Sequence, residues 1–151
     1  MYRKILVPVD GSPTAALGLA EAIKLAKNQG ATLRLIHVVN EFIMASPYEG
    51  FAAGQVIDAL REGGKTLLQE TAASVRSAGI EVDTHCEEAI GGQAGAHIVQ
   101  NAKAWPADLI VMGTHGRRGI RRMVMGSDAE YVVRHTPVPI LLVRGQESPK
   151  A

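Results

Sequence analysis

Short apolar runs alternate along the chain with longer stretches in which apolar residues recur at helical spacing. The continuous apolar runs are 4–9, 31–39, 109–112 and 138–143. Such runs are typical of parallel strands that are buried on both faces. The segment 80–86 alternates apolar and polar residues instead, which indicates a fifth strand with one wetter face at the edge of a sheet.

Helix signals fill the segments between these strands. Ser12 and Pro13 supply an N-cap and a proline for the first helical turn. Gly30 and Gly79 follow the first and second helices as C-terminal glycines, and Trp105 precedes a proline that ends the third. The helices are expected to begin at Pro13, Gln55, Gly91 and Ser127.

Strands that alternate with helices throughout predict one open α/β domain with a parallel sheet. The domain is expected to span 1–146, followed by a frayed tail at 147–151. Residues 40–54 interrupt the pattern, and a loop of this length is usually functional or mobile. Its apolar residues are open to two interpretations, as a cover for a ligand or partner and as packing on the domain's own edge.

Composition narrows the function classes. The 151 residues are 46% hydrophobic, which suffices for a sizeable core. Lysine and arginine (16) nearly balance aspartate and glutamate (15), so no overall field favours nucleic acid or an anionic membrane. The single cysteine excludes an internal disulfide and fits a reducing compartment. Neither a signal peptide nor a membrane span is apparent, so a cytoplasmic protein is expected.

Candidate chemistry gathers where the fourth apolar run ends. Leu109 to Met112 is followed by Gly113 and Gly116, and the pair Gly126-Ser127 opens a helix. Glycine lets a backbone approach a ligand closely, and free N–H groups at a helix N-terminus attract anions. The stretch therefore predicts a phosphate-binding loop.

The spacing Gly113-x2-Gly116-x9-Gly126-Ser127 resembles the nucleotide-binding motif of the universal stress protein family, in its ATP-binding branch. The run 5–12 (ILVPVDGS) is similar to the family's first strand and acidic turn, and 136–144 to its last strand. The resemblance implies a five-stranded parallel sheet of order 3-2-1-4-5 with helices on both faces, Rossmann-like and similar to the adenine nucleotide alpha hydrolases. It also implies a homodimer through Val138–Val143, whose apolar edge would otherwise be bare.

By the same resemblance, the ligand is ATP, or ADP or AMP in its place, with Mg²⁺ as an optional companion on the phosphates. Ligands bind such sheets at the carboxyl ends of strands where the strand order reverses, here between strands one and four. The implied nucleotide-binding residues are Pro8, Val9, Asp10, Val38, Val39, Met112, Gly113, Gly116, Arg117, Gly126, Ser127 and Asp128.

Several of these residues have a structural alternative. Ser127 and Glu130 match a helix capping box, and Asp10 matches an ordinary turn aspartate. The basic residues of the loop, His115 included, suit solvent as well as phosphate. Asp128 departs from the small or apolar residue usual in the family, and we expect it to face the phosphates and weaken or tune binding.

Other apparent motifs fail. Gly64-Lys65-Thr66 lacks the first glycine of a P-loop and lies in a helical pattern. The run 85–88 (HCEE) offers metal-ligand types, but neighbouring strand residues point to opposite faces. His37, His97 and His135 are scattered and are interpreted as structural or surface residues.

The function that this pattern favours is a nucleotide-responsive stress-signalling dimer that acts on protein partners the sequence does not identify. Two alternatives stay open. One is a slow ATPase, for which no catalytic residue can be assigned. The other is a nucleotide-free dimeric interaction module.

Overall fold

The computed structural model describes residues 1–40, 51–115 and 125–145, with the side chains of 51–53 left out. Most of the predicted loop 40–54, the residues Gly116 and Arg117, and the predicted tail lie outside the described residues.

The described chain alternates strands and helices in the predicted order. The strands are β1 (Lys4–Pro8), β2 (Thr32–Asn40), β3 (Val82–Ala89), β4 (Leu109–Gly113) and β5 (Ile140–Val143). The helices are α1 (Pro13–Gln29), α2 (Phe51–Ser77), α3 (Ala94–Ala104) and α4 (Ser127–His135). The strands form one five-stranded parallel sheet of order β3-β2-β1-β4-β5, which confirms the predicted topology.

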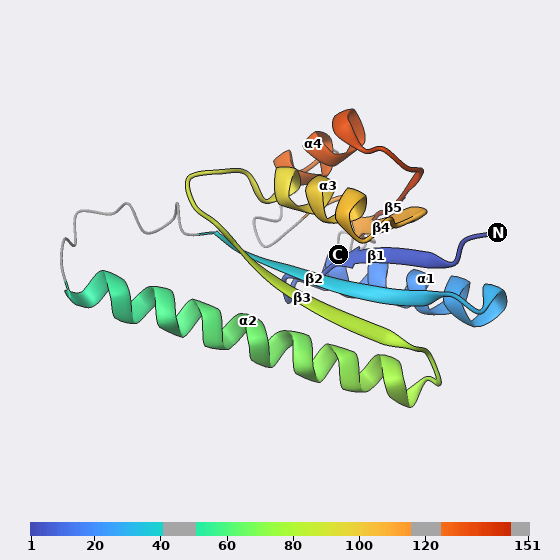
Figure 1. Ribbon diagram of the computed structural model, residues 1–151, viewed down its shortest axis with the longest axis horizontal. Coiled ribbons are helices and arrows are strands. Elements are labelled where there is room, and N and C mark those ends of the chain that lie inside the picture. Colours follow the sequence, from blue (N-terminus) through green and yellow to red (C-terminus); the bar gives the residue numbers. More distant parts are fainter. Residues whose placement is uncertain (41–50, 116–124, 146–151) are drawn as a thin grey trace, which may run out of the picture.

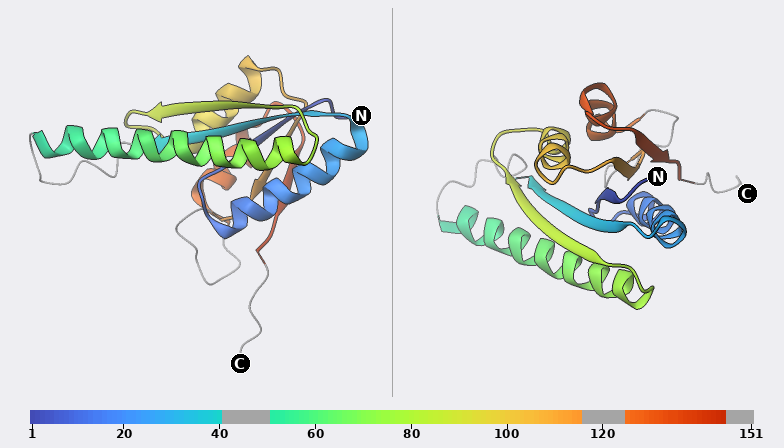
Figure 2. Two further views of the ribbon diagram at one scale, coloured as in Figure 1. Left: turned by 90° about the horizontal axis from the view of Figure 1, so that it is seen from below. Right: turned by 45° about the vertical axis from the view of Figure 1, so that its right-hand side comes forward.

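Two helices cover each face of the sheet (Figure 1). Figure 2 shows α1 and α2 together on one side and α3 on the other. Alternate residues of β1 serve the two cores: Ile5 and Val7 pack with α1 and α2, and Leu6 packs with α3 and α4. Because both faces of β1 and β4 are buried, these strands read as continuous apolar runs.

Local signals account for several boundaries. Ser12 caps α1 by accepting a hydrogen bond from the N–H of Ala15 (3.2 Å), as predicted. Gly30 and Gly79 have φ of 66° and 80°, the left-handed conformation expected of glycines after a helix.

Three predicted boundaries are wrong by three or four residues. Helix α2 begins at Phe51 rather than Gln55, and Gly54, which reads as part of a loop, lies inside it. Helix α3 begins at Ala94 rather than Gly91, because Gly91 has φ of 65°, outside the right-handed helical region. Strand β3 runs on to Ala89 rather than ending at Cys86, because Glu87, Glu88 and Ala89 pair with the last residues of β2. The prediction that β3 is an edge strand is confirmed.

No helix within the described ranges is both long and apolar enough to cross a bilayer.

Candidate functional site

The candidate site lies at the carboxyl edge of the sheet, where the strand order reverses between β1 and β4. The two strands pair directly, with Ile5 opposite Leu109 and Leu6 opposite Ile110. This register brings the end of β1 and the glycine that ends β4 to the same edge. The position is the one at which parallel α/β sheets bind ligands.

A tight turn follows β1. Gly11 has φ of 81°, which favours glycine, and the N–H of Ser12 donates to Oδ1 of Asp10 at 2.8 Å. Asp10 therefore shapes the turn that leads into α1, which confirms its structural interpretation. A carboxylate has several acceptor positions, so contact between Asp10 and a ribose stays a prediction.

Gly113 is required by close packing against the first turn of α1. A Cβ at this position would lie 2.7 Å from Cγ2 of Thr14 and 2.8 Å from its carbonyl oxygen. Any side chain would therefore push α1 away from β4. Thr14 was not predicted to belong to this site, and only the packing of the two elements reveals it.

Thr114 connects the two ends of the glycine-rich stretch. Its N–H donates to the carbonyl of Val143 at 3.0 Å, and its carbonyl accepts from the N–H of Gly126 at 2.8 Å. The start of α4 is therefore tied to the end of β4. These bonds are backbone bonds, so no residue type in the sequence announces them.

Helix α4 begins at Ser127, as predicted, but it is not capped by the Ser127 side chain. Its N-cap is Gly126, and no side chain caps it within the described part of the chain, so the predicted Ser127-x-x-Glu130 capping box is wrong. The N–H of Glu130 bonds the Gly126 carbonyl at 2.9 Å. By helix geometry the N–H groups of Ser127, Asp128 and Ala129 have no acceptor inside the helix. These three donors and the exposed Ser127 hydroxyl lie beside the end of β4.

The end of β2 is held to the turn after β1. The N–H of Val9 donates to the carbonyl of Ile36 at 2.8 Å, and Nδ1 of His37 lies 2.8 Å from the carbonyl of Val9. Nδ1 must carry the proton here, because a carbonyl only accepts. His37 is 8% exposed, so its structural interpretation is confirmed. Val38 is half-buried and Val39 is buried beside this turn.

Asp128 has a partner that the sequence does not suggest. Its Oδ1 accepts a hydrogen bond from the N–H of Gly95 in α3 at 3.0 Å. The expectation that the carboxylate faces the phosphates is therefore not supported by its observed contact.

His115 has a buried ring nitrogen at this edge. Its Nδ1 lies 2.9 Å from Oγ1 of Thr114, and its Nε2 is buried with no hydrogen-bond partner among the residues that the structure describes. Gly116 and Arg117, the next two predicted site residues, lie outside the described residues. Pro8 is the last residue of β1, and Met112 directly precedes Gly113, the last residue of β4, so both lie at this edge of the sheet.

Two side chains with shifted pKa values, Arg61 and Cys86, lie between α2 and β3 rather than between β1 and β4. A hydrogen bond from Arg61 to Glu88 raises the pKa of the exposed Arg61 guanidinium, and partial burial raises the pKa of the Cys86 thiol. The arrangement at the site itself is one of backbone donors at a helix N-terminus, which suits an anionic group.

Two solved structures of similar fold are described as nucleotide complexes. A universal stress protein in complex with cAMP is 22% identical, with a TM-score of 0.68, and the match covers 94% of this chain and 97% of that one. The universal stress protein from Archaeoglobus fulgidus in complex with dAMP is 24% identical, with a TM-score of 0.65, covering 94% and 98%. At these levels of sequence identity, the structural similarity shows that the fold is shared.

Closer matches show the family. The solved structure of the hypothetical protein MJ0577 has a TM-score of 0.87 at 26% identity and covers 98% of this chain and 99% of that one. Universal stress protein MJ0531 of Methanocaldococcus jannaschii is 33% identical over 148 residues, covering 95% of this chain and 83% of the relative. The profile of the universal stress protein family matches residues 1–144. The chain therefore belongs to the universal stress protein family.

Proposed function

We propose that this protein binds an adenine nucleotide, with ATP as the first candidate. Occupancy of the site changes the population of a conformational or assembly state that protein partners recognise. One observation carries the proposal. Three N–H groups at the start of α4 lack helical acceptors at the edge of the sheet where β1 and β4 end. The two family structures described as complexes with cAMP and dAMP support the choice of an adenine nucleotide.

In this proposal the phosphates lie against the N–H groups of Ser127, Asp128 and Ala129, with Mg²⁺ on their outer oxygens when it is present. Hydrogen bonds to a charged acceptor contribute about 1.5–3 kcal/mol each. Three of them contribute roughly 5–9 kcal/mol, comparable to the roughly 8 kcal/mol of a micromolar complex before association costs are subtracted. Contacts to the nucleoside therefore have to supply the remainder.

Contacts to the nucleoside fall to the ends of β1 and β2. Pro8, Val9 and Asp10 are assigned to the adenosine side, and the backbone of Val38 or Val39 to the adenine edge. Gly113 and Gly116 are assigned to the sugar and phosphates, and Arg117 to the phosphates, by the motif alone.

The experiment is a calorimetric titration of nucleotide-stripped protein with Mg²⁺-ATP, on the wild type and on Ser127→Asp. An acid at the first helical position stabilises a helix by about 0.3–1 kcal/mol, so the variant should melt no lower than the wild type. The negative charge of the introduced aspartate repels the phosphates, which costs about 1 kcal/mol of binding free energy in water and about 4 kcal/mol at a partly shielded site. We expect micromolar binding in the wild type and at least about a fivefold loss of affinity in the variant.

Ser127→Ala serves as the neutral control and should lose only the contribution of one hydroxyl. No heat with ATP, ADP, AMP or cAMP would refute the proposal. Equal affinity of Ser127→Asp and the wild type would refute the placement of the phosphates at α4.

We further propose that the protein is a cytoplasmic homodimer that pairs through β5. This strand is one edge of the sheet, and Leu141 on it is 39% exposed. Unpaired edges with exposed apolar residues are usually covered by another chain.

A further inference from the structure

The first turn of α3 lacks a cap from its own sequence neighbour. Its N-cap residue is Gln93, whose side chain makes no capping hydrogen bond within the described residues. An N-cap side chain normally accepts from the N–H of the second or third helical residue. Gly95 is the second residue of α3, and its N–H donates to Oδ1 of Asp128, which belongs to α4. One helix therefore supplies the cap of the other.

The two helices touch at this point. A Cβ on Gly95 would lie 2.9 Å from the carbonyl oxygen of Asp128 and 2.9 Å from Cβ of Tyr131. Gly95 is buried, so an added side chain has no solvent to turn into. The absence of a side chain at Gly95 is what lets the two first turns come this close.

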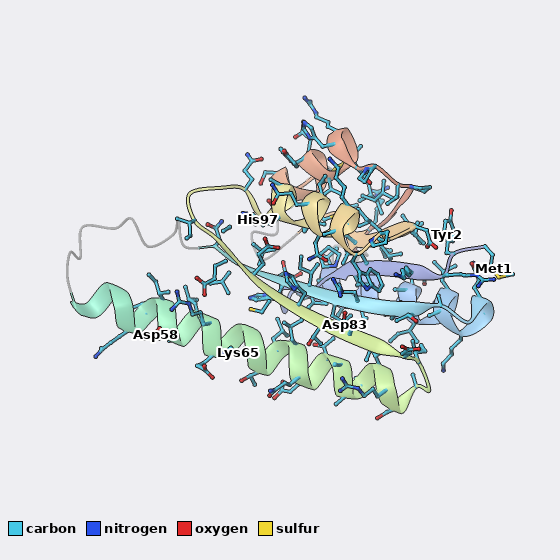
Figure 3. All side chains as sticks on the ribbon, in the orientation of Figure 1. Met1, Tyr2, Asp58, Lys65, Asp83 and His97 are labelled. Carbon is cyan, nitrogen blue, oxygen red and sulfur yellow. The ribbon has the colours of Figure 1, made fainter. Side chains whose placement is uncertain are left out.

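The first turn of α3 is itself firmly held. Nδ1 of His97 lies 3.0 Å from Oε1 of Glu87 on β3. Figure 3 shows His97 at the α3 side of the sheet, away from Asp58 and Lys65 on α2. The turn that Asp128 contacts is therefore anchored to the sheet independently of α4.

The first turn of α4 has a second anchor on its other side, where Gly126 donates to the carbonyl of Thr114 at the end of β4. Two hydrogen bonds thus hold the turn that carries the proposed phosphate donors, one from the backbone and one from the Asp128 side chain. The carboxylate lies at the N-terminal end of two helices, and both dipoles favour a negative charge there.

We propose that Asp128 is a positioning residue of the nucleotide site: it binds the N-terminus of α3 and thereby fixes the direction of the phosphate-binding N–H groups of α4. This inference rests on the proposed function. A positioning role predicts the opposite effect of removing Asp128 on nucleotide affinity from the effect that charge repulsion predicts. If Asp128 faced the phosphates, removing it would tighten binding, most of all for ATP. As a positioning residue, its removal weakens the binding of AMP, ADP and ATP by similar factors.

The test measures the affinities of Mg²⁺-ATP, Mg²⁺-ADP and AMP for Asp128→Ala, Asp128→Asn and the wild type. We expect Asp128→Ala to bind about tenfold more weakly, within the range that loss of a cap produces. Asp128→Asn keeps an acceptor oxygen and should recover most of the affinity. Glu130→Gln is the matched control, because it removes the same charge from the same turn but leaves α3 untouched; Glu130 pairs with Arg134 instead.

Amide exchange at Gly95 without nucleotide is the second readout, since a lost cap exposes this N–H to exchange. Faster exchange together with weaker binding in Asp128→Ala supports the proposal. Faster exchange with unchanged affinity overturns it, because the cap is then structural only. Tighter binding that grows with the number of phosphates also overturns it. A wild type that binds none of the nucleotides refutes the proposed function before any variant is compared, and the positioning role with it.

Gly95→Ala keeps the proposal falsifiable if Asp128→Ala folds poorly. The added side chain separates the two helices without changing a charge, and the variant should bind all three nucleotides more weakly, as Asp128→Ala does. Unchanged affinity in Gly95→Ala, with accelerated exchange of the N–H of residue 95, would overturn the proposal in the same way.

Discussion

Alanine substitution is expected to have opposite effects on stability at two adjacent glycines of α2, Gly63 and Gly64. Gly63 is exposed, and a Cβ there would meet nothing within 4 Å. Gly64 is buried, and a Cβ there would lie 2.6 Å from Cδ2 of His37 and 3.5 Å from Sγ of Cys86. The His37 ring is not free to move, because its Nδ1 is bonded to the carbonyl of Val9.

The magnitudes follow from these contacts. Alanine in place of glycine gains about 1 kcal/mol of helix propensity at either position. At Gly64 the added methyl costs about 1–3 kcal/mol of overpacking, and displacement of the His37 ring costs about 1 kcal/mol more through its hydrogen bond. Gly63→Ala should therefore stabilise the protein by about 1 kcal/mol, whereas Gly64→Ala should destabilise it by roughly 1–3 kcal/mol.

Thermal unfolding followed by circular dichroism measures both effects, with urea titration as a second assay. For a domain of this size, 1 kcal/mol corresponds to about 2–4 °C. We expect Gly63→Ala to melt about 2–4 °C above the wild type and Gly64→Ala about 2–12 °C below it. An equal rise for both variants would refute the packing of His37 against Gly64.

Four further predictions concern other parts of the molecule. Gly113→Ala should destabilise the protein by about 1–3 kcal/mol, because its Cβ would lie within 3 Å of Thr14, whereas Gly145→Ala, at an ordinary 3.5 Å from the same residue, should not; equal melting points would contradict this. Because burial raises the pKa of the Cys86 thiol, iodoacetamide should modify native protein at pH 8 more slowly than urea-unfolded chain. Equal alkylation rates of native and unfolded protein would contradict the raised pKa. The same pKa shift predicts that the free energy of unfolding, measured by urea titration, falls as pH rises above about 8.5, because the folded state keeps a proton that the unfolded chain releases. Leu141→Glu should shift a sedimenting dimer to monomer, and a wild type that is monomeric at micromolar concentration would refute pairing through β5.

The parts of the fold that the sequence predicts are those with a local cause. The buried faces of β1 and β4 require continuous apolar runs, and Ser12 followed by Pro13 marks the start of α1 wherever the rest of the chain goes. The prediction ends β3 too early because Glu87 and Glu88 have low strand propensity. Both residues are nevertheless extended, because they pair with β2.

The candidate site is predictable as a place but less so in its contacts. The glycines at 113 and 126 mark the loop, yet the capping box fails because Gly126 takes the N-cap position that Ser127 was expected to hold. The hydrogen bond from Gly95 to Asp128 joins two residues that are 33 positions apart in the sequence, so no local pattern predicts it. Gly64, part of an apparent P-loop in the sequence, instead makes room for a histidine ring.

The central claim, that nucleotide phosphates bind at the start of α4, is tested most directly by amide chemical shifts recorded during a titration with Mg²⁺-ATP. The account predicts that the largest changes fall on the N–H groups of Ser127, Asp128 and Ala129, with smaller changes at Val9 and Asp10. Saturation without changes at the start of α4, or no changes anywhere in the protein at millimolar ATP, would contradict it.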